Sequence, residues 1–550
     1  MYTFPKLNLN SKWVEDTLAS LSLAQKIGQL LHPCLQPSVS VEAREAHLDG
    51  IQPGGIFLFP GLKRQFAEIT TWFQEMSTVP VIVSADLENG AGRIIEDATT
   101  FPELMSLAAT GREDLAYEMG RAAAIEGRAC GIHWSYGPIV DMNLNPYCPG
   151  ASTRTLGSDP DLIAKLSGAM IRGMQENGLC ATVKHFPGAG LDDRDSHICT
   201  TINSLRMHEW LALSGRMFQN AIDMGVWSIM TGHISLPAWD PGSGEHIQAA
   251  PPSTISKKLL TDLLRDRMGF DGVIITDALD MGGVTSWGSF DEIIPSAILA
   301  GCDMILFSEP RRDFDILMGA VKEGRLTEER INQSVRRILA LKERLGLHVS
   351  TTPFYVSETD KISFQQVSEE ISEKALTIVR DKHKTLPLTL SQDRRVLCYH
   401  LRGDPEENVD TFDDLLREMG VDVDTYTEQD IGKFPRNIDL SNYDFILLNV
   451  VLTPSWGTSR IRPAGNYMRD VWSLITSHHP GLVVISYGSP YIGYEMPHVT
   501  TVINSYSPDT NTQMAVLKLL TGQIQANGTS PVDLDSPYQL KALEGLRCIL

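Results

Sequence analysis

The amino-acid sequence predicts an α/β protein, with a (β/α)8 TIM-like barrel followed by a smaller α/β layered domain. Up to about residue 345, short runs rich in valine, isoleucine and aromatic residues alternate with amphipathic helical stretches, which is typical of a parallel sheet. A second, shorter series of such units follows a segment rich in turn-forming residues. At 550 residues the chain is also too long for a single hydrophobic core.

Eight apolar runs are candidate strands of the barrel. They are residues 27–33, 54–59, 80–86, 132–141, 180–186, 226–233, 272–277 and 303–308. The first is ambiguous, because LAQKIGQLL fits an amphipathic helix equally well. Helical patterns such as PDLIAKLSGAMIRGMQENG, with glycine at the C-terminal end, separate several of the runs. Eight β/α units within about 320 residues fit a closed barrel better than an open sheet.

The remaining sequence predicts a linker and a second domain. The segment HVSTTPFYVSETDK indicates a linker over 348–365. Beyond it we expect a helix over 364–379 and then further strands and helices in alternation. The expected strands are 394–401, 421–426, 443–451, 482–490 and 501–506. The predicted domains are therefore a barrel over 1–347, the linker, and an αβα sandwich over 366–550.

Composition and charge restrict the class of protein. A hydrophobic share of 42% is typical of a folded globular chain, and the net charge of -21 disfavours nucleic-acid and anionic-membrane partners. The eight cysteines show no paired spacing, so we expect neither a disulfide framework nor a zinc site. No apolar stretch has the length of a membrane span or a signal segment, so we expect a cytoplasmic protein, or a secreted one if a signal has been removed. The oligomeric state is left open.

Polar residues stand where several predicted strands end. They are Asp86, Asp141, Lys184, His185, His233 and Asp277. In a parallel barrel the C-terminal strand ends meet at the mouth that carries the active site. Asp277, after the apolar run GVIIT, has two interpretations: a nucleophile held by a buried strand, or the N-cap of the next helix.

The segment KHFPGAGLDDRDSH, residues 184–197, concentrates ionisable groups. Asp195 and His197 are two residues apart, so a bent loop can bring them together. A carboxylate bonded to an imidazole fixes the ring tautomer and makes the ring a proton donor near neutral pH. A solvated loop with local turn bonds is the alternative interpretation. Because glycines and polar residues leave the loop little to pack against, we expect it to move.

This segment resembles the KHFPGHG…DSH signature of glycoside hydrolase family 3, in its β-N-acetylglucosaminidase branch. Six further blocks are similar to family elements and occur in the family's order. They are SADLENGAGR (84–93), TTFPELMSLAAT (99–110), GPIVDMNLNP (137–146), RTLGSDP (154–160), MTGHISLP (230–237) and GFDGVIITDALDMGGV (269–284). The resemblance spans the predicted barrel and is weaker in the second domain. Where the family usually has histidine, this chain has Ala189, which puts the leaving-group preference in question.

The resemblance implies a retaining exo-β-N-acetylglucosaminidase that works by double displacement without metal or organic cofactor. Asp277 is then the nucleophile, and His197 with its partner Asp195 is the acid/base. Sugar binding is implied for Asp86, Arg154, Lys184 and His185. The expected substrate is a small glycoside or an oligosaccharide with a terminal N-acetylglucosamine.

Three other functions remain open. A phosphorylase is possible because an imidazole acid/base repels an incoming phosphate less than a carboxylate does. A metal-dependent amidohydrolase barrel is suggested by His185, His233 and Asp277 at strand ends, but the H-x-H pair expected on strand 1 is missing, where only His32 occurs. A sugar-binding barrel without catalysis needs neither a nucleophile nor a proton donor.

Overall fold

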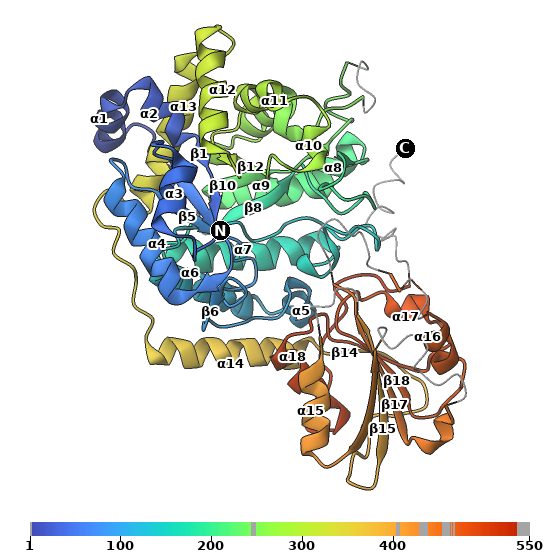
Figure 1. The fold of residues 1–550 in the computed structure, drawn as a ribbon. Coiled ribbons are helices and arrows are strands. Elements are labelled where there is room, and N and C mark those ends of the chain that lie inside the picture. Colours follow the sequence, from blue (N-terminus) through green and yellow to red (C-terminus); the bar gives the residue numbers. More distant parts are fainter. Residues whose placement is uncertain are drawn as a thin grey trace. The chain divides into compact units, whose positions relative to one another are not determined.

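The computed structural model describes residues 3–243, 249–402, 408–427, 438–453, 462, 463, 465 and 468–535 (Figure 1). The chain divides into two compact units. The first comprises Met1–Thr100, Ala116–Asp141 and Ser167–Phe364, and the second comprises Phe101–Leu115, Met142–Leu166 and Gln365–Leu550. Two segments within the predicted barrel domain, 101–115 and 142–166, thus group with the second unit.

The first unit contains short parallel strands. They are β1 (Leu31–His32), β2 (Cys34–Leu35), β3 (Gly55–Leu58), β4 (Gly61–Leu62), β5 (Ile82–Ala85), β6 (Ile95–Glu96), β7 (Trp134–Ser135), β8 (Thr182–Phe186), β9 (Thr201–Ile202), β10 (Ser228–Thr231), β11 (Ile234–Ser235), β12 (Val273–Thr276) and β13 (Ile305–Leu306). Strand β2 pairs with β3, β3 with β5 and β5 with β7, while β8 pairs with β10 and β10 with β12. Bridges join Trp134 to Cys180 and Ile275 to Met304, and β13 pairs with β1.

Helices alternate with these strands along the chain. They are α1 (Lys12–Ser20), α2 (Leu23–Gln29), α3 (Val41–Leu48), α4 (Lys63–Met76), α5 (Leu104–Thr110), α6 (Glu113–Ala129), η1 (Ser152–Arg154), α7 (Pro160–Glu176), α8 (Met207–Ala212), α9 (Ser214–Met224), η2 (Ser253–Ile255), the π-helix η3 (Lys258–Arg267), α10 (Gly282–Thr285), α11 (Phe290–Ala300), α12 (Pro310–Lys322) and α13 (Glu328–Arg344). In the described part of the chain, no helix has the length and apolarity needed to cross a membrane.

The first predicted strand, 27–33, is wrong over most of its length. Helix α2 continues to Gln29, and only Leu31–His32 is extended. The hydroxyl of Ser22 caps α2, and Gln25 completes a capping box by returning a bond to the Ser22 backbone. Each of the other seven predicted runs contains an observed strand. All residues of β3, β5, β10 and β12 are buried, as expected for strands covered on both faces.

The second unit contains a six-stranded sheet of order β14-β19-β18-β17-β15-β16. Its elements are α14 (Glu358–Ala375), β14 (Thr377–Asp381), β15 (Arg395–Arg402), α15 (Asp410–Glu418), β16 (Asp422–Thr427), η5 (Leu440–Asn442), β17 (Phe445–Val451), α16 (Met468–Ile475), β18 (Leu482–Ser486), α17 (Ile492–Glu495), β19 (Thr501–Asn504) and α18 (Thr510–Leu520). Only β14 is antiparallel to its neighbour. One apolar cluster joins the sheet to α15 and α18 and another joins it to α16 and α17, so helices cover both faces.

Two sequence predictions differ from the structure around the start of this unit. Helix α14 begins at Glu358, inside the predicted linker 348–365. It ends at Ala375, and the residues that follow form β14 instead of the last turn of the predicted helix 364–379. Residues Thr377, Ile378 and Val379 are all β-branched, which favours the extended backbone.

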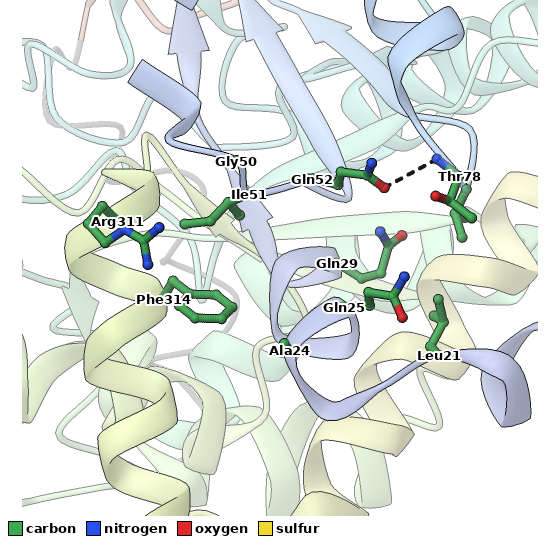
Figure 2. Close-up of a pocket in the computed structure, with 11 residues that line it drawn as sticks. Leu21, Ala24, Gln25, Gln29, Gly50, Ile51, Gln52, Thr78, Arg311 and Phe314 are labelled. Carbon is green, nitrogen blue, oxygen red and sulfur yellow. Dashed lines mark hydrogen bonds between the residues drawn. The ribbon is translucent and has the colours of Figure 1, made fainter. Parts of the chain in front are cut away.

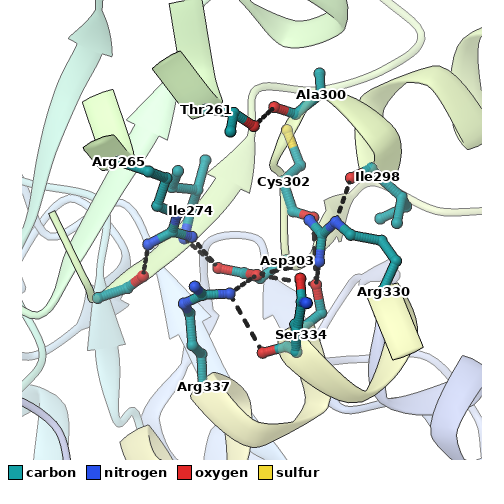
Figure 3. A network of polar contacts seen from close by, with 12 residues as sticks. Thr261, Arg265, Ile274, Ile298, Ala300, Cys302, Asp303, Arg330, Ser334 and Arg337 are labelled. Carbon is teal, nitrogen blue, oxygen red and sulfur yellow. Dashed lines mark hydrogen bonds and ion pairs between the residues drawn. The ribbon is translucent and has the colours of Figure 1, made fainter. Parts of the chain in front are cut away.

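A buried ionic network lies where β12 and β13 begin (Figure 3). The carboxylate of Asp303, which is fully buried, accepts hydrogen bonds from Arg265 at 2.6 Å, from the Ile274 N–H at 3.0 Å and from Ser334 at 2.9 Å. Burial raises the pKa of Asp303, but the nearby arginines lower it by more, so the pKa is below its ordinary value. The network therefore joins two strands to η3 and α13 at the ends opposite the predicted site.

Candidate active site

Six of the seven predicted site residues belong to the first unit. Asp86 follows β5, Lys184 and His185 lie in β8, and Asp277 follows β12. Asp195 and His197 lie in the loop after β8. Arg154 ends η1, in the segment 142–166 that groups with the second unit.

The ammonium group of Lys184 is held by two carboxylates. Its Nζ lies 3.0 Å from Oδ1 of Asp86 and 2.6 Å from Oε1 of Glu88, and its side chain is 4% exposed. A buried ammonium needs such partners, because an unpaired charge is costly away from water. The predicted sugar-binding residues Asp86 and Lys184 are thus brought together. Glu88 was missed by sequence reasoning, although it is the glutamate of the block SADLENGAGR.

Asp141 orients His185 and the start of the following loop. Its Oδ2 lies 2.7 Å from Nδ1 of His185, and its Oδ1 accepts the Ala189 N–H at 2.7 Å. The His185 N–H also donates to this carboxylate. The position of residue 189 is therefore fixed through its backbone N–H. This group is present whatever the side chain, so alanine can occupy the position.

Asp195 and His197 form a hydrogen-bonded pair. Oδ1 of Asp195 lies 2.6 Å from Nδ1 of His197 and also accepts the His197 N–H at 2.9 Å. Because an ionised carboxylate only accepts hydrogen bonds, the neutral ring carries its proton on Nδ1. The carboxylate side chain is 8% exposed and the imidazole 31%, so the ring is anchored on its inner side and reaches solvent on the other.

Asp192 anchors part of the loop that carries this pair, and the movement expected of the loop stays a prediction. The carboxylate of Asp192 accepts the Ile202 N–H at 2.8 Å and binds the Arg194 guanidinium at 2.9 and 2.6 Å. The last residues of the loop form β9, which pairs with β11. Asp192 therefore closes the loop at its base and is not merely solvated.

Asp277 is partly exposed at the end of β12. Its Oδ1 accepts the Ala278 N–H at 2.9 Å. Burial raises the pKa of this carboxyl, but neighbouring groups, with His185 first and the Ala278 N–H among them, lower it by more, so the pKa lies below its ordinary value. The helix-cap interpretation is wrong, because α10 starts only at Gly282 and has Met281 at its N-cap. Asp277 is thus an ionised carboxylate that does not cap helix α10.

His233 supports the backbone beside Asp277. It is fully buried, with Nδ1 2.8 Å from the Thr254 hydroxyl and Nε2 2.7 Å from the Ala278 carbonyl. Burial lowers the pKa of His233, so the ring is neutral. Both ring nitrogens are occupied, which leaves no lone pair for a metal. Within the described residues, no group of three or more histidine, cysteine, aspartate or glutamate side chains is arranged to hold a metal ion.

A cavity of about 310 Å³ lies elsewhere in the first unit (Figure 2). It is lined by residues of α2 and α12 and by the segments that lead into β3 and β5, including Gln29, Gln52, Arg311 and Phe314. These are the N-terminal ends of the strands. The lining contains no aspartate, glutamate or histidine and so offers no acid/base pair.

Comparison with known proteins identifies the family. Residues 22–341 match the model of the glycosyl hydrolase family 3 N-terminal domain. The chain is 33% identical over 544 residues to a β-N-acetylglucosaminidase/β-glucosidase of Cellulomonas fimi, covering 95% of each. The chain belongs to glycoside hydrolase family 3. The family predicted from the sequence motifs is thereby confirmed, and with it the prediction of a glycoside hydrolase.

Two solved structures resemble the chain over nearly its whole length. A β-glucoside phosphorylase bound to 2FGlc has a TM-score of 0.85 and 30% identity, covering 96% of this chain and 98% of that one. A family 3 β-N-acetylglucosaminidase from Paenibacillus sp. str. FPU-7 has a TM-score of 0.80 and 28% identity, covering 94% and 99%. The names of these two similar structures are thus a β-glucoside phosphorylase and a β-N-acetylglucosaminidase.

Proposed function

We propose that this family 3 enzyme is a retaining exo-β-N-acetylglucosaminidase. The observation that carries the proposal is the Asp195–His197 pair on the loop after β8, together with the ionised Asp277 after β12. Retaining hydrolysis needs one nucleophile and one group that first donates and then accepts a proton. The names of the relatives from Cellulomonas fimi and Paenibacillus support N-acetylglucosamine as the sugar.

In the first step, the Asp277 carboxylate attacks the anomeric carbon and forms a glycosyl ester. The bond to the leaving oxygen breaks as protonated His197 donates its proton to that oxygen, while Asp195 keeps the proton on Nδ1. In the second step, neutral His197 takes a proton from water, and the water oxygen attacks the anomeric carbon. The ester bond then breaks, which restores both the Asp277 carboxylate and the protonated ring.

Sugar binding is assigned to Asp86, Lys184 and His185 at the strand ends. The Lys184 ammonium, held between two carboxylates, presents a fixed donor to sugar hydroxyls, and the carboxylates present acceptors. Arg154 keeps its assigned role in the sugar site on the strength of the RTLGSDP block alone. The roles of Asp86, Lys184 and His185 rest on a proposed (β/α)8 barrel, which is supported by the parallel pairings β1–β13, β3–β5 and β10–β12.

A second candidate is a β-glycoside phosphorylase, in which phosphate replaces water in the second step and a sugar 1-phosphate leaves. It is favoured by the similarity to the solved phosphorylase and by an imidazole acid/base, which carries no negative charge to repel phosphate. We assign either activity to the cytoplasm, because seven of the eight cysteines, all in the described part of the chain, are free thiols.

Product analysis separates the two candidates. The 4-nitrophenyl β-glycosides of N-acetylglucosamine and of glucose are each incubated with enzyme, with and without inorganic phosphate. We expect free N-acetylglucosamine with retained configuration, at a rate that phosphate does not change. Sugar 1-phosphate as the main product would establish the phosphorylase instead. If neither glycoside releases nitrophenol, both candidates are wrong.

A further inference from the structure

Two glycines that follow β12 form backbone hydrogen bonds to the loop that contains Asp195 and His197. The Gly282 N–H donates to the His197 carbonyl at 2.8 Å, and the Gly283 N–H donates to the Ser196 carbonyl at 3.0 Å. The loop after β8 and the segment after β12 are thus joined through the backbone of His197 itself. Gly282 and Gly283 are five and six residues beyond Asp277.

Glycine is needed here because of the close approach. A Cβ atom on Gly282 would lie 2.3 Å from the Ile198 carbonyl oxygen, and one on Gly283 would lie 2.6 Å from that of Ser196. The Gly283 Cβ would also lie 2.7 Å from Cβ of His233. None of these neighbours is the flexible end of a side chain, so a methyl group at either position must push the loop outward.

Two side-chain hydrogen bonds also join the loop after β8 to the segment after β12, and we call this set of contacts the junction. The buried hydroxyl of Thr200 donates to the Gly283 carbonyl at 2.6 Å, and the indole N–H of Trp287 donates to that hydroxyl at 2.7 Å. Thr200 is three residues beyond His197, and Trp287 is ten residues beyond Asp277. The loop is therefore tied to the nucleophile segment on both sides of the histidine carbonyl.

We propose that Gly282, Gly283 and Thr200 are positioning residues, which fix the His197 imidazole relative to the Asp277 carboxylate. The inference rests on the proposed function of these two groups. The pair is held by one continuous set of short contacts. Displacing a catalytic group by about 1 Å can cost on the order of 100-fold in rate, so this junction controls turnover without touching the substrate.

Alanine at 282 or 283 and valine at 200 test this role. With methyl β-N-acetylglucosaminide, whose leaving group must be protonated, we expect kcat to fall at least tenfold in G282A and G283A. With the 2,4-dinitrophenyl glycoside, whose leaving group needs little protonation, the fall should be less than threefold. Thr200→Val should show the same pattern of losses. Thr200→Ser, which keeps the hydroxyl, should have kcat values close to those of the wild type on both substrates. The control is Gly319→Ala on α12, where a Cβ meets nothing within 4 Å.

Equal losses on both substrates, or no loss in any variant, would overturn the inference. Hydrogen exchange of the loop peptide 191–202 provides a readout that does not depend on turnover. We expect protection in the wild-type enzyme and in G319A, and faster exchange in G283A and T200V. An unprotected loop in the wild type would also overturn it, whereas a wild type with a protected loop but no release of dinitrophenol would contradict only the proposed function.

Discussion

The Nδ1 atom of His197 lies 2.6 Å from Oδ1 of Asp195, and the same oxygen accepts the His197 backbone N–H. One carboxylate oxygen thus fixes both the ring and the residue that carries it. Removing the Asp195 carboxylate frees the His197 ring to rotate and to change tautomer. Proton transfer is then impaired, although the imidazole itself is still present.

Asp195→Ala should therefore lower kcat/KM in proportion to the need for protonation of the leaving group. Over a series of aryl β-N-acetylglucosaminides, we expect the variant to show a steeper dependence of rate on phenol pKa than the wild type. General acid catalysis is typically worth about 100- to 10,000-fold, which bounds the loss for the poorest leaving group. The control is Asp193→Ala, an exposed carboxylate on the same loop. A parallel dependence in D195A and wild type would remove the acid assignment.

Asp277→Ala should abolish turnover of N-acetylglucosaminides, because no glycosyl ester can form. The smaller side chain leaves space beside the anomeric carbon, so sodium azide should restore release of an activated phenol. The azide attacks from the vacated face, and the product should be the α-glycosyl azide, identified by NMR. Asp280→Ala, which removes an exposed carboxylate three residues later, should keep the wild-type rate. A β-configured azide product would show that Asp277 is not the nucleophile.

Most strands of the first unit could be predicted from the sequence because they are buried on both faces. Runs such as GVIITD and DMILFS carry apolar β-branched residues without interruption, and each contains an observed strand. The run 27–33 failed because a short apolar stretch has no distinctive period. The Ser22–Gln25 capping box at its beginning was the signal that distinguishes the helix.

The sequence predicted individual residues of the candidate site but not the contacts between them. Strand-end residues such as Lys184 and Asp277 are visible from their position after apolar runs. The partner of Lys184 at Glu88 and the anchoring of Ala189 by Asp141 depend on contacts between loops far apart in the sequence. Backbone bonds such as that from Gly282 leave no mark in the side-chain pattern, so the sequence does not show how the loop after β8 is attached.

Asp303→Asn should destabilise the first unit strongly. The substitution preserves volume but leaves Arg265 and the arginines of α13 around an uncharged amide (Figure 3). Breaking a buried ion pair typically costs about 3–5 kcal/mol, and we expect a loss of this size in the free energy of unfolding. Chemical denaturation followed by tryptophan fluorescence measures it. Asp266→Asn, at an exposed position of η3, should change stability by less than about 0.5 kcal/mol. An equal effect of the two substitutions would contradict the role of the network.

Lys342 should make stability depend on pH. It is fully buried on α13, with its Nζ donating to Oε1 of Gln29 at 2.6 Å, and burial lowers the pKa of Lys342 to about 7. Between this pKa and the ordinary value of 10.5, the unfolded chain holds a proton that the folded chain has released. The free energy of unfolding should therefore rise with pH across this window, by about 1.4 kcal/mol per pH unit, and show no such rise below about pH 7.

Comparison with Lys342→Met isolates this contribution. At pH 6 the methionine variant avoids a buried ammonium and should be the more stable protein. As the pH rises from 7 to 9, the wild type gains stability from deprotonation of Lys342 and the variant does not, so the difference between them should shrink. Lys342→Gln, which keeps a polar group near Gln29 without a charge, should follow the methionine variant in slope while differing in absolute stability. Denaturation midpoints of the three proteins at half-unit pH steps give the slopes, and parallel curves for all three would show that Lys342 does not release its proton in this range.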